Sequence, residues 1–208
     1  MDARDWDERY AASELVWSRE PNGFVAAELA DLPPGTAVDL AAGEGRNAIW
    51  LASRGWDATA VDFSQVALDK GARLAAEAGI EVTWVCADAT SWQPPAPVDL
   101  VVVAYLQLPA DDRRRAVRSA ITMLRPGGTL LLVAHDSTNL TEGTGGPQDP
   151  SVLMTAEDVL ADLEGYDVEV LRAERVAREV RSADPAHHEH GGEERRTAWD
   201  CLVRVVRR

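Results

Sequence analysis

Acidic residues end a succession of short apolar stretches in this sequence, and a turn of small residues follows the first of them. Asp39 and Asp62 close two strand-like stretches, and Asp88 follows a third. Gly43 and Gly45, in the turn after Asp39, remove side chains where the backbone could pass close to a ligand. Parallel strands end at one edge of their sheet, where such folds bind ligands. The pattern therefore predicts a binding site lined by carboxylates.

Charge separates two kinds of ligand that this turn could bind. The G-x-G-x-x-A spacing of residues 43–48, with Asp62 about 20 residues further on, also matches a dinucleotide-binding pattern. A pyrophosphate needs unpaired N–H groups and no nearby anions. Asp39 and Glu44 would repel it, and they favour a ligand that carries an ammonium and a sulfonium but no phosphate. A nicotinamide-dependent oxidoreductase remains the alternative.

The elements that must position these residues follow from the hydrophobic pattern. Strands are expected at 37–40, 58–62, 82–86, 98–103 and 129–134, and helices at 47–54, 64–78, 111–124 and 155–163. This alternation predicts a Rossmann-like α/β fold, a parallel sheet with helices on both faces. Two longer strand-like stretches, 167–180 and 195–206, flank a polar turn and predict a C-terminal antiparallel hairpin.

Composition limits the classes of protein and partner. With 46% hydrophobic and 27% charged residues, the 208-residue chain is typical of a globular protein. It has no uncharged apolar run of about 18 residues, and its first residues are acidic rather than basic, so we expect no membrane partner and a cytoplasmic location. A net charge of −14 disfavours a nucleic-acid partner. We expect Cys86 and Cys201 to be buried free thiols.

A series of short segments carries a more specific signal. The segments are DLAAGEGRN at 39–47, VDFS at 61–64, ADA at 87–89, DLV at 99–101 and LRPGG at 124–128. Together they resemble the successive motifs of class I S-adenosylmethionine-dependent methyltransferases, and residues 45–48 are similar to the tellurite-resistance and thiopurine-type branch. The resemblance covers roughly residues 5–134 and implies a seven-stranded methyltransferase fold. Ala41 departs from it, because the family usually has its first glycine there.

The resemblance implies that S-adenosylmethionine is the cofactor and assigns its parts. Asp39, Gly43 and Gly45 would face the methionine part, Asp62 the ribose, and Asp88 with Ala89 the adenine. The expected cofactor contacts in full are Trp17, Asp39, Ala41, Gly43, Gly45, Arg46, Asn47, Asp62, Phe63, Ser64, Asp88, Ala89 and Ala104.

The resemblance also divides one methyltransferase domain, residues 1–208, into parts. Residues 1–35 would form an N-terminal helical lid, 36–135 the cofactor-binding core, and 136–208 the acceptor-side loops and hairpin. Aromatic residues of the lid, Trp6, Tyr10 and Trp17, could cover a sulfonium. Alternatively they pack a helix onto the sheet.

The methyl acceptor is expected over the ends of the fourth and fifth strands. Candidate substrate-binding residues there are Tyr105, Leu106, Gln107 and His135. Methyl transfer needs mainly alignment and exclusion of water. His135 is the candidate catalytic residue, as a general base, because an unperturbed histidine titrates near neutrality. The alternative is a strand-end histidine bonded to Asp136.

The acceptor is expected to be a small molecule, because no inserted domain enlarges the site. The branch resemblance favours a soft nucleophile such as a thiol, selenide or telluride. A phenol or small hydroxyl compound, or a cofactor-binding module without turnover, remain alternatives. The residues around His187, His188 and His190 read as a solvated loop rather than a metal site, and residues 143–147 as a flexible loop near the acceptor. Arg113 and its neighbouring arginines read as a solvated helix face, and oligomeric state is not indicated.

Overall fold

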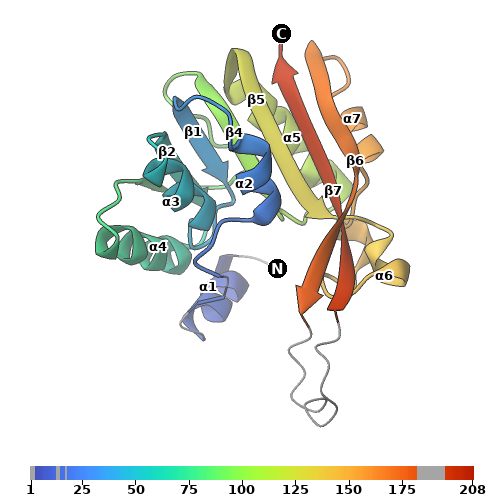
Figure 1. Ribbon diagram of the computed structural model, residues 1–208, viewed down its shortest axis with the longest axis horizontal. Helices are drawn as coiled ribbons and strands as arrows, with labels where there is room; N and C mark the ends of the chain where they lie inside the picture. The colour runs from blue at the N-terminus through green and yellow to red at the C-terminus, as the bar shows by residue number, and fades with distance from the viewer. Residues whose placement is uncertain (1–2, 13–14, 17, 182–194) are drawn as a thin grey trace.

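A single mixed sheet organises the protein. The computed structural model describes residues 3–12, 15–16, 18–181 and 195–208. The seven strands are ordered β3-β2-β1-β4-β5-β7-β6 (Figure 1). They are β1 (Thr36–Leu40), β2 (Asp57–Asp62), β3 (Thr83–Cys86), β4 (Val98–Ala104), β5 (Leu124–His135), β6 (Val168–Arg181) and β7 (Arg195–Arg207). The first five run parallel, and β7 lies antiparallel between β5 and β6, which confirms the predicted fold class.

Helices cover both faces of the sheet (Figure 1). They are α1 (Ala3–Ala11), α2 (Gly23–Leu29), α3 (Arg46–Ser53), α4 (Gln65–Glu77), α5 (Ala110–Met123), α6 (Asn139–Glu142) and α7 (Ala156–Asp162), with a 3₁₀ turn at Pro150–Val152. As the sequence predicts, Ser64 caps α4 by accepting a hydrogen bond from the Ala67 amide. Within the described part of the chain, each helix is too short or too polar to span a bilayer.

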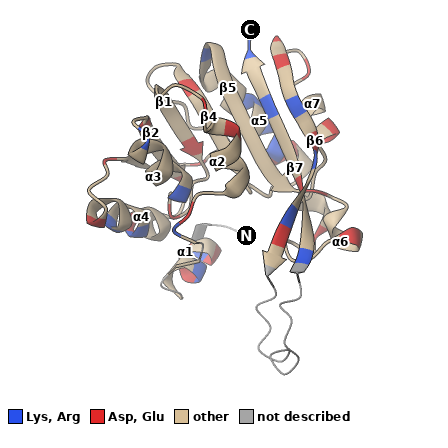
Figure 2. Cartoon of the chain, in the orientation of Figure 1, with Lys and Arg blue, Asp and Glu red and all other residues tan. Residues whose placement is uncertain are grey.

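The central strand β4 shows why its residues 100–103 are all apolar. Leu100 and Val102 face a core cluster that α2 and α3 complete on one side of the sheet. Val101 and Val103 face the second cluster, which α5 and α7 complete on the other side. Because successive side chains of a strand point to opposite faces, a strand covered on both faces must be apolar at every position. Charged residues accordingly gather on the helices and the hairpin (Figure 2).

Two residues differ from the expectation for their segments. Arg113 is buried, and its guanidinium pairs with the Asp162 carboxylate at 2.6 Å, so it ties α5 to α7 instead of facing solvent. Cys86 is exposed, because β3 is the edge strand and Cys86 is its last residue. Cys201 is buried as expected, and burial raises the pKa of its thiol to about 12.

The C-terminal hairpin brings distant residues to the carboxyl end of β5. In the ladder between β5 and β7, Asp200 lies directly opposite His135. In the ladder between β6 and β7, Asp200 lies opposite Val176, so Arg178 is its diagonal neighbour. Side chains at such positions are within reach of one another. The predicted histidine-rich turn, 182–194, lies outside the described residues.

Candidate functional site

The turn after β1 is built from residues in left-handed conformations. Ala41, Gly43 and Gly45 have φ angles of 59°, 56° and 71°. The Gly43 amide donates to Asp62 Oδ2 at 2.8 Å, which ties the turn to the end of β2. The left-handed φ of Ala41 gives a physical reason for the glycine that the resemblance leads one to expect there, because glycine adopts this conformation without steric penalty.

Asp39 lies under this turn as an incompletely satisfied buried carboxylate. Its Oδ2 accepts a hydrogen bond from the Ala48 amide at 3.1 Å. Its Oδ1 is buried without a hydrogen-bond partner among the described residues. Burial raises its pKa from 3.8 to about 7, while the Ala48 hydrogen bond and the charge of Arg46 oppose that rise. A buried acceptor without a donor is a position at which a cationic ligand would be favourable.

Asp62 is the second buried acid at this edge. It accepts hydrogen bonds from the Gly43 and Ser64 amides, and burial raises its pKa despite them. Asp62 is close enough to Asp39 to raise the pKa of that carboxyl. The structure thus brings together two of the three predicted acids. Asp88 follows β3 as an exposed residue whose Oδ1 accepts from the Thr90 amide and hydroxyl.

The remaining predicted cofactor residues differ in their positions and contacts. The Asn47 side chain accepts from the Asn22 amide at 3.0 Å, and an Arg46 Nη1 lies 3.4 Å from Ser18 Oγ. Ala89 is buried in the core cluster beside α5, whereas Phe63 and Ala104 are partly exposed at the ends of β2 and β4. Trp17 lies outside the described residues.

Glu44 has a different environment from the one expected. Its carboxylate pairs with Lys70 Nζ at 2.8 Å and accepts from the Val16 amide. The pairing neutralises Glu44, so it does not add negative charge to the ligand site. Asp39 and Asp62 are therefore the acids that disfavour a pyrophosphate here.

The N-terminal helix packs on α4. Tyr10 is buried, its ring lies 5.6 Å from that of Trp6, and its carbonyl accepts from Lys70 Nζ. Asp7 accepts a hydrogen bond from the Ser64 hydroxyl. For Tyr10 the packing alternative is therefore the one observed, although the helix packs on α4 rather than on the sheet.

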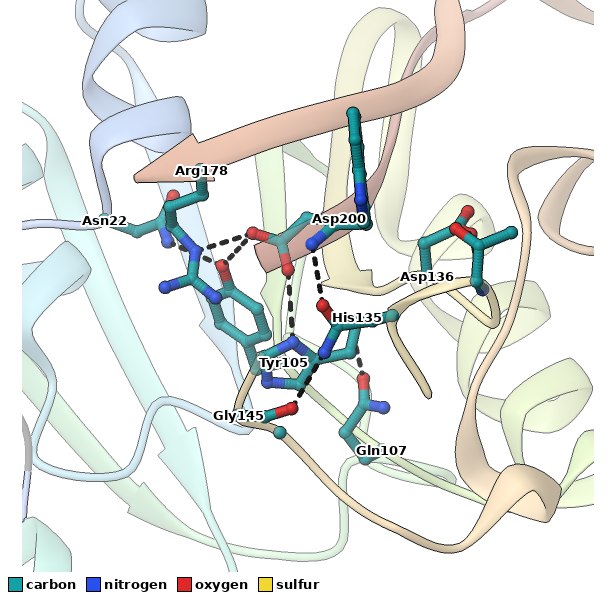
Figure 3. A network of polar contacts seen from close by, with 12 residues as sticks. Asn22, Tyr105, Gln107, His135, Asp136, Gly145, Arg178 and Asp200 are labelled. Carbon is teal, nitrogen blue, oxygen red and sulfur yellow. Dashed lines mark hydrogen bonds and ion pairs between the residues drawn. The ribbon is translucent and has the colours of Figure 1, made fainter. Parts of the chain in front are cut away.

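On the acceptor side, Asp200 is the centre of a polar network (Figure 3). Its carboxylate is fully buried and accepts from the Tyr105 hydroxyl at 2.8 Å and from Arg178 Nε at 2.7 Å. His135 Nδ1 lies 3.1 Å from Asp200 Oδ1. Asn22 extends the network, because its amide nitrogen lies 3.4 Å from the Tyr105 hydroxyl. One buried carboxylate thus contacts Tyr105 just after β4, His135 at the end of β5 and Arg178 in β6.

The charge state of this network follows from its contacts. Burial alone would raise the pKa of Asp200, but contacts with His135, Arg178 and Tyr105 outweigh it and hold that pKa below its ordinary value. Burial, together with the charge of Asp200, raises the pKa of Tyr105. Asp200 is therefore an ionised acceptor, and Tyr105 is a protonated donor. Tyr105 also has a φ of 60°, a conformation that non-glycine residues retain only where their surroundings enforce it.

The imidazole of His135 is held on several sides. The Tyr105 ring lies 4.8 Å away, and Gly146 approaches so closely that a Cβ there would lie 3.1 Å from the ring atoms. The side-chain amide of Gln107 accepts a hydrogen bond from the His135 backbone amide and donates one to the Val152 carbonyl. Leu106 packs against the core. Of the predicted acceptor residues, Tyr105 contacts the His135 imidazole and Gln107 contacts the His135 backbone amide.

Comparison with known proteins shows what the chain is similar to. Residues 37–128 match the family model described as "Methyltransferase domain". The structure of the N-methyltransferase NodS from Bradyrhizobium japonicum WM9, in complex with S-adenosyl-L-homocysteine, superimposes with a TM-score of 0.72 at 19% identity, covering 100% of this chain and 99% of NodS. Residues 37–128 are therefore similar to a methyltransferase domain, and the chain shares the fold of NodS.

Three curated relatives of this chain have names that refer to different substrates. It is 34% identical over 107 residues to ribosomal RNA small subunit methyltransferase C from Alcanivorax borkumensis, 49% of this chain and 33% of the relative. It is 32% identical over 129 residues to trans-aconitate 2-methyltransferase from Azoarcus sp., 61% and 46%. It is 25% identical over 162 residues to thiocyanate methyltransferase 1 from Brassica oleracea, 74% and 70%. The match thus spans less than half of the length of the first two relatives.

Sequence reasoning missed some members of the acceptor-side network around Asp200. Asp200, Arg178 and Asn22 were not among the predicted residues. Asp200 did leave a signal, since it is an acid within the otherwise apolar stretch 198–203. A buried strand tolerates an acid only where partners satisfy it. The expected alternative for His135 was wrong, because Asp136 bonds Thr138 and Figure 3 shows it apart from the imidazole.

The raised pKa of Asp39 predicts a pH-dependent stability. Below about pH 4, the folded and unfolded states both hold this proton, so its contribution to stability is fully present. As the pH rises from about 4 to 7, the unfolded chain loses the proton while the folded protein keeps it. The contribution of Asp39 to the free energy of unfolding should therefore fall over this range and level off above about pH 7.

Asp39→Asn should remove this component. Urea unfolding from pH 4 to 8 should show the variant gaining stability relative to the unmodified protein as the pH rises. Asp57→Asn, at the exposed start of β2, serves as the control and should show no such trend. A stability difference for Asp39→Asn that is the same at every pH would contradict the assignment.

Proposed function

We propose that this protein transfers the methyl group of S-adenosylmethionine to the sulfur of a small thiol or to another soft chalcogen. The observation that carries the proposal is the contact of His135 with Tyr105 and the ionised Asp200. An imidazole held in this way at the ends of β4 and β5 suits a nucleophile that must lose a proton. Thiols are such nucleophiles, since the thiolate is their reactive form.

The turn of residues 41–45 after β1, called the cofactor turn below, has acidic surroundings that suit the positive charges of S-adenosylmethionine. The unpartnered Oδ1 of Asp39 offers an acceptor for an ammonium group, and the left-handed turn keeps the backbone near Gly43 free of a side chain. Asp62 would hold the ribose hydroxyls, and Asp88 with Ala89 the adenine. When bound, S-adenosylmethionine supplies a methyl group on a sulfonium, which the acceptor takes as the carbon–sulfur bond breaks. The chain's own task is alignment and removal of the acceptor's proton.

Two further observations favour a small sulfur acceptor over a nucleic acid. The net charge of −14 repels phosphates, although one relative is named for ribosomal RNA. Another relative is named for thiocyanate, a sulfur nucleophile, and it matches over 70% of its length. A cytoplasmic location accords with this proposal, because thiols stay reduced there.

An acceptor screen tests the proposal. The protein is incubated with S-adenosylmethionine and, separately, with aryl and alkyl thiols, phenols, selenite, tellurite and a ribosomal RNA fragment, and the products are identified by mass spectrometry. S-methylated or Se/Te-methylated products are expected. O-methylation of phenols alone, or methylation of RNA alone, would overturn the choice of acceptor. Binding of S-adenosylhomocysteine without any methylated product would favour the binding module.

A further inference from the structure

The two nitrogens of the His135 imidazole are in different environments. Nδ1 is buried and lies 3.1 Å from Asp200 Oδ1, and neither atom has a hydrogen bond of regular geometry among the described residues. Nε2 has neither a hydrogen bond nor an ion pair within the described part of the chain, and the side chain keeps 15% of its surface exposed. A carboxylate beside one nitrogen makes that nitrogen the protonated one. The opposite nitrogen then has a lone pair to offer.

The rest of the network prevents Asp200 from turning away. Oδ2 accepts from both Tyr105 and Arg178, so the carboxylate is anchored through one oxygen and faces His135 with the other. Asp200 is also locked in register opposite His135 by the ladder between β5 and β7. The Tyr105 ring and the Gly146 backbone then limit rotation of the imidazole. The Asp200 carboxylate therefore accounts both for the position of the His135 ring and for which of its nitrogens carries the proton.

We propose that Asp200 is a positioning residue that keeps the proton of His135 on Nδ1 and so makes Nε2 the base for an acceptor with an S–H or aromatic O–H bond. The inference rests on the proposed function for its thiol acceptors and extends to phenols, because both carry a removable proton. As the acceptor's bond to hydrogen breaks, its electron pair stays on sulfur or oxygen and the proton passes to Nε2. The resulting imidazolium is stabilised by Asp200 and later releases the proton to water.

This role predicts a dependence on acceptor acidity that a purely structural role would not produce. A series of substituted thiophenols and phenols spans acceptors that are ionised at the assay pH and acceptors that are not. For Asp200→Asn and for His135→Gln, kcat/KM should fall about 100-fold or more with un-ionised acceptors. With acceptors that are already ionised it should change by no more than about threefold, since they have no proton to remove.

Asp162→Asn is the matched control. Asp162 is buried like Asp200 and also pairs with an arginine, Arg113, but it lies between α5 and α7. Its variant should lose stability without any dependence on acceptor acidity. If Asp200→Asn slowed all acceptors by the same factor, as a destabilised fold would, the positioning role would be refuted.

A second readout does not depend on turnover. His135 is the one histidine of the chain outside residues 187–190, so ¹⁵N-histidine NMR can assign it by comparison with His135→Gln. Neutral His135 should carry its proton on Nδ1 in the unmodified protein and lose that preference in Asp200→Asn. A proton on Nε2 in the unmodified protein would overturn the inference. If the screen finds no thiol or other chalcogen acceptor, the proposed function fails, and this spectrum still decides the role of Asp200.

Discussion

Gly45→Ala should destabilise the protein by about 2–5 kcal/mol, from two separate causes. The φ of Gly45 is 71°, and a left-handed alanine is disfavoured by about 1–2 kcal/mol. A Cβ at this position would also lie 2.5 Å from two atoms of the Trp84 ring. The indole lies between the cofactor turn and α4 and has backbone on both sides, so overpacking should add about 1–3 kcal/mol. Urea unfolding measures the loss directly.

Two other glycines separate these causes. Gly79 has a φ of 69° with nothing within 4 Å of an added Cβ, so Gly79→Ala reports the backbone conformation alone, at about 1–2 kcal/mol. Gly71 has an ordinary helical conformation, but its Cβ would lie 2.5 Å from Trp84 and 2.6 Å from the Glu44 carbonyl oxygen. Gly71→Ala therefore reports the collision, reduced by the roughly 1 kcal/mol by which alanine is favoured over glycine inside a helix. Equal losses for Gly45→Ala and Gly79→Ala would show that Trp84 moves aside without penalty.

Asp62→Ala should weaken binding of S-adenosylhomocysteine about 10- to 100-fold. A hydrogen bond to a charged acceptor contributes about 1.5–3 kcal/mol, and each 1.4 kcal/mol is a factor of about ten in affinity. The substitution removes the proposed ribose acceptor. It also removes the carboxylate that accepts from the Gly43 and Ser64 amides, so the cofactor turn loses its tie to β2. Titration calorimetry with the thioether measures the dissociation constant.

Asp57→Ala is the control for this second prediction. Asp57 begins the same strand, at the opposite edge of the sheet, and is exposed. Its variant should bind the thioether as the unmodified protein does. Asp62→Asn should lie between the two, because an amide oxygen can still accept one hydrogen bond but carries no charge. Unchanged affinity in Asp62→Ala would remove Asp62 from the cofactor site.

The elements that carry the cofactor turn were predictable because their signals are local. The apolar run of β4 predicts a strand covered on both faces, and the spacing of residues 43–48 predicts a tight turn into a helix. Asp39 and Asp62 were placed correctly at one sheet edge, because parallel strands necessarily end together. The division of the sheet into a parallel core and a C-terminal antiparallel hairpin was also predictable, because the sequence indicates helices between most of the first five strands and a polar turn between the last two.

Pairing between residues far apart in the sequence was not predictable in the same way. The ion pairs Arg113–Asp162 and Glu44–Lys70 form only when the helices have packed. The sequence alone therefore predicted a solvated Arg113 and placed Glu44 in the ligand site. Cys86 became exposed because β3 ends up at the edge of the sheet, which its own residues do not indicate.

The α/β class, the order of the elements and the carboxylates around the cofactor turn could therefore be predicted from the sequence, since each depends on periodicity or on strand ends. The arrangement of the acceptor side depends instead on how β5, β6 and β7 pair in the folded protein. His135 could be predicted as a candidate general base from its residue type. Its partner Asp200 is 65 positions away in the sequence, and the two residues come together because β7 lies antiparallel beside β5. A change of register by one residue would turn Asp200 to the other face of the sheet, and no local signal in the sequence specifies that register.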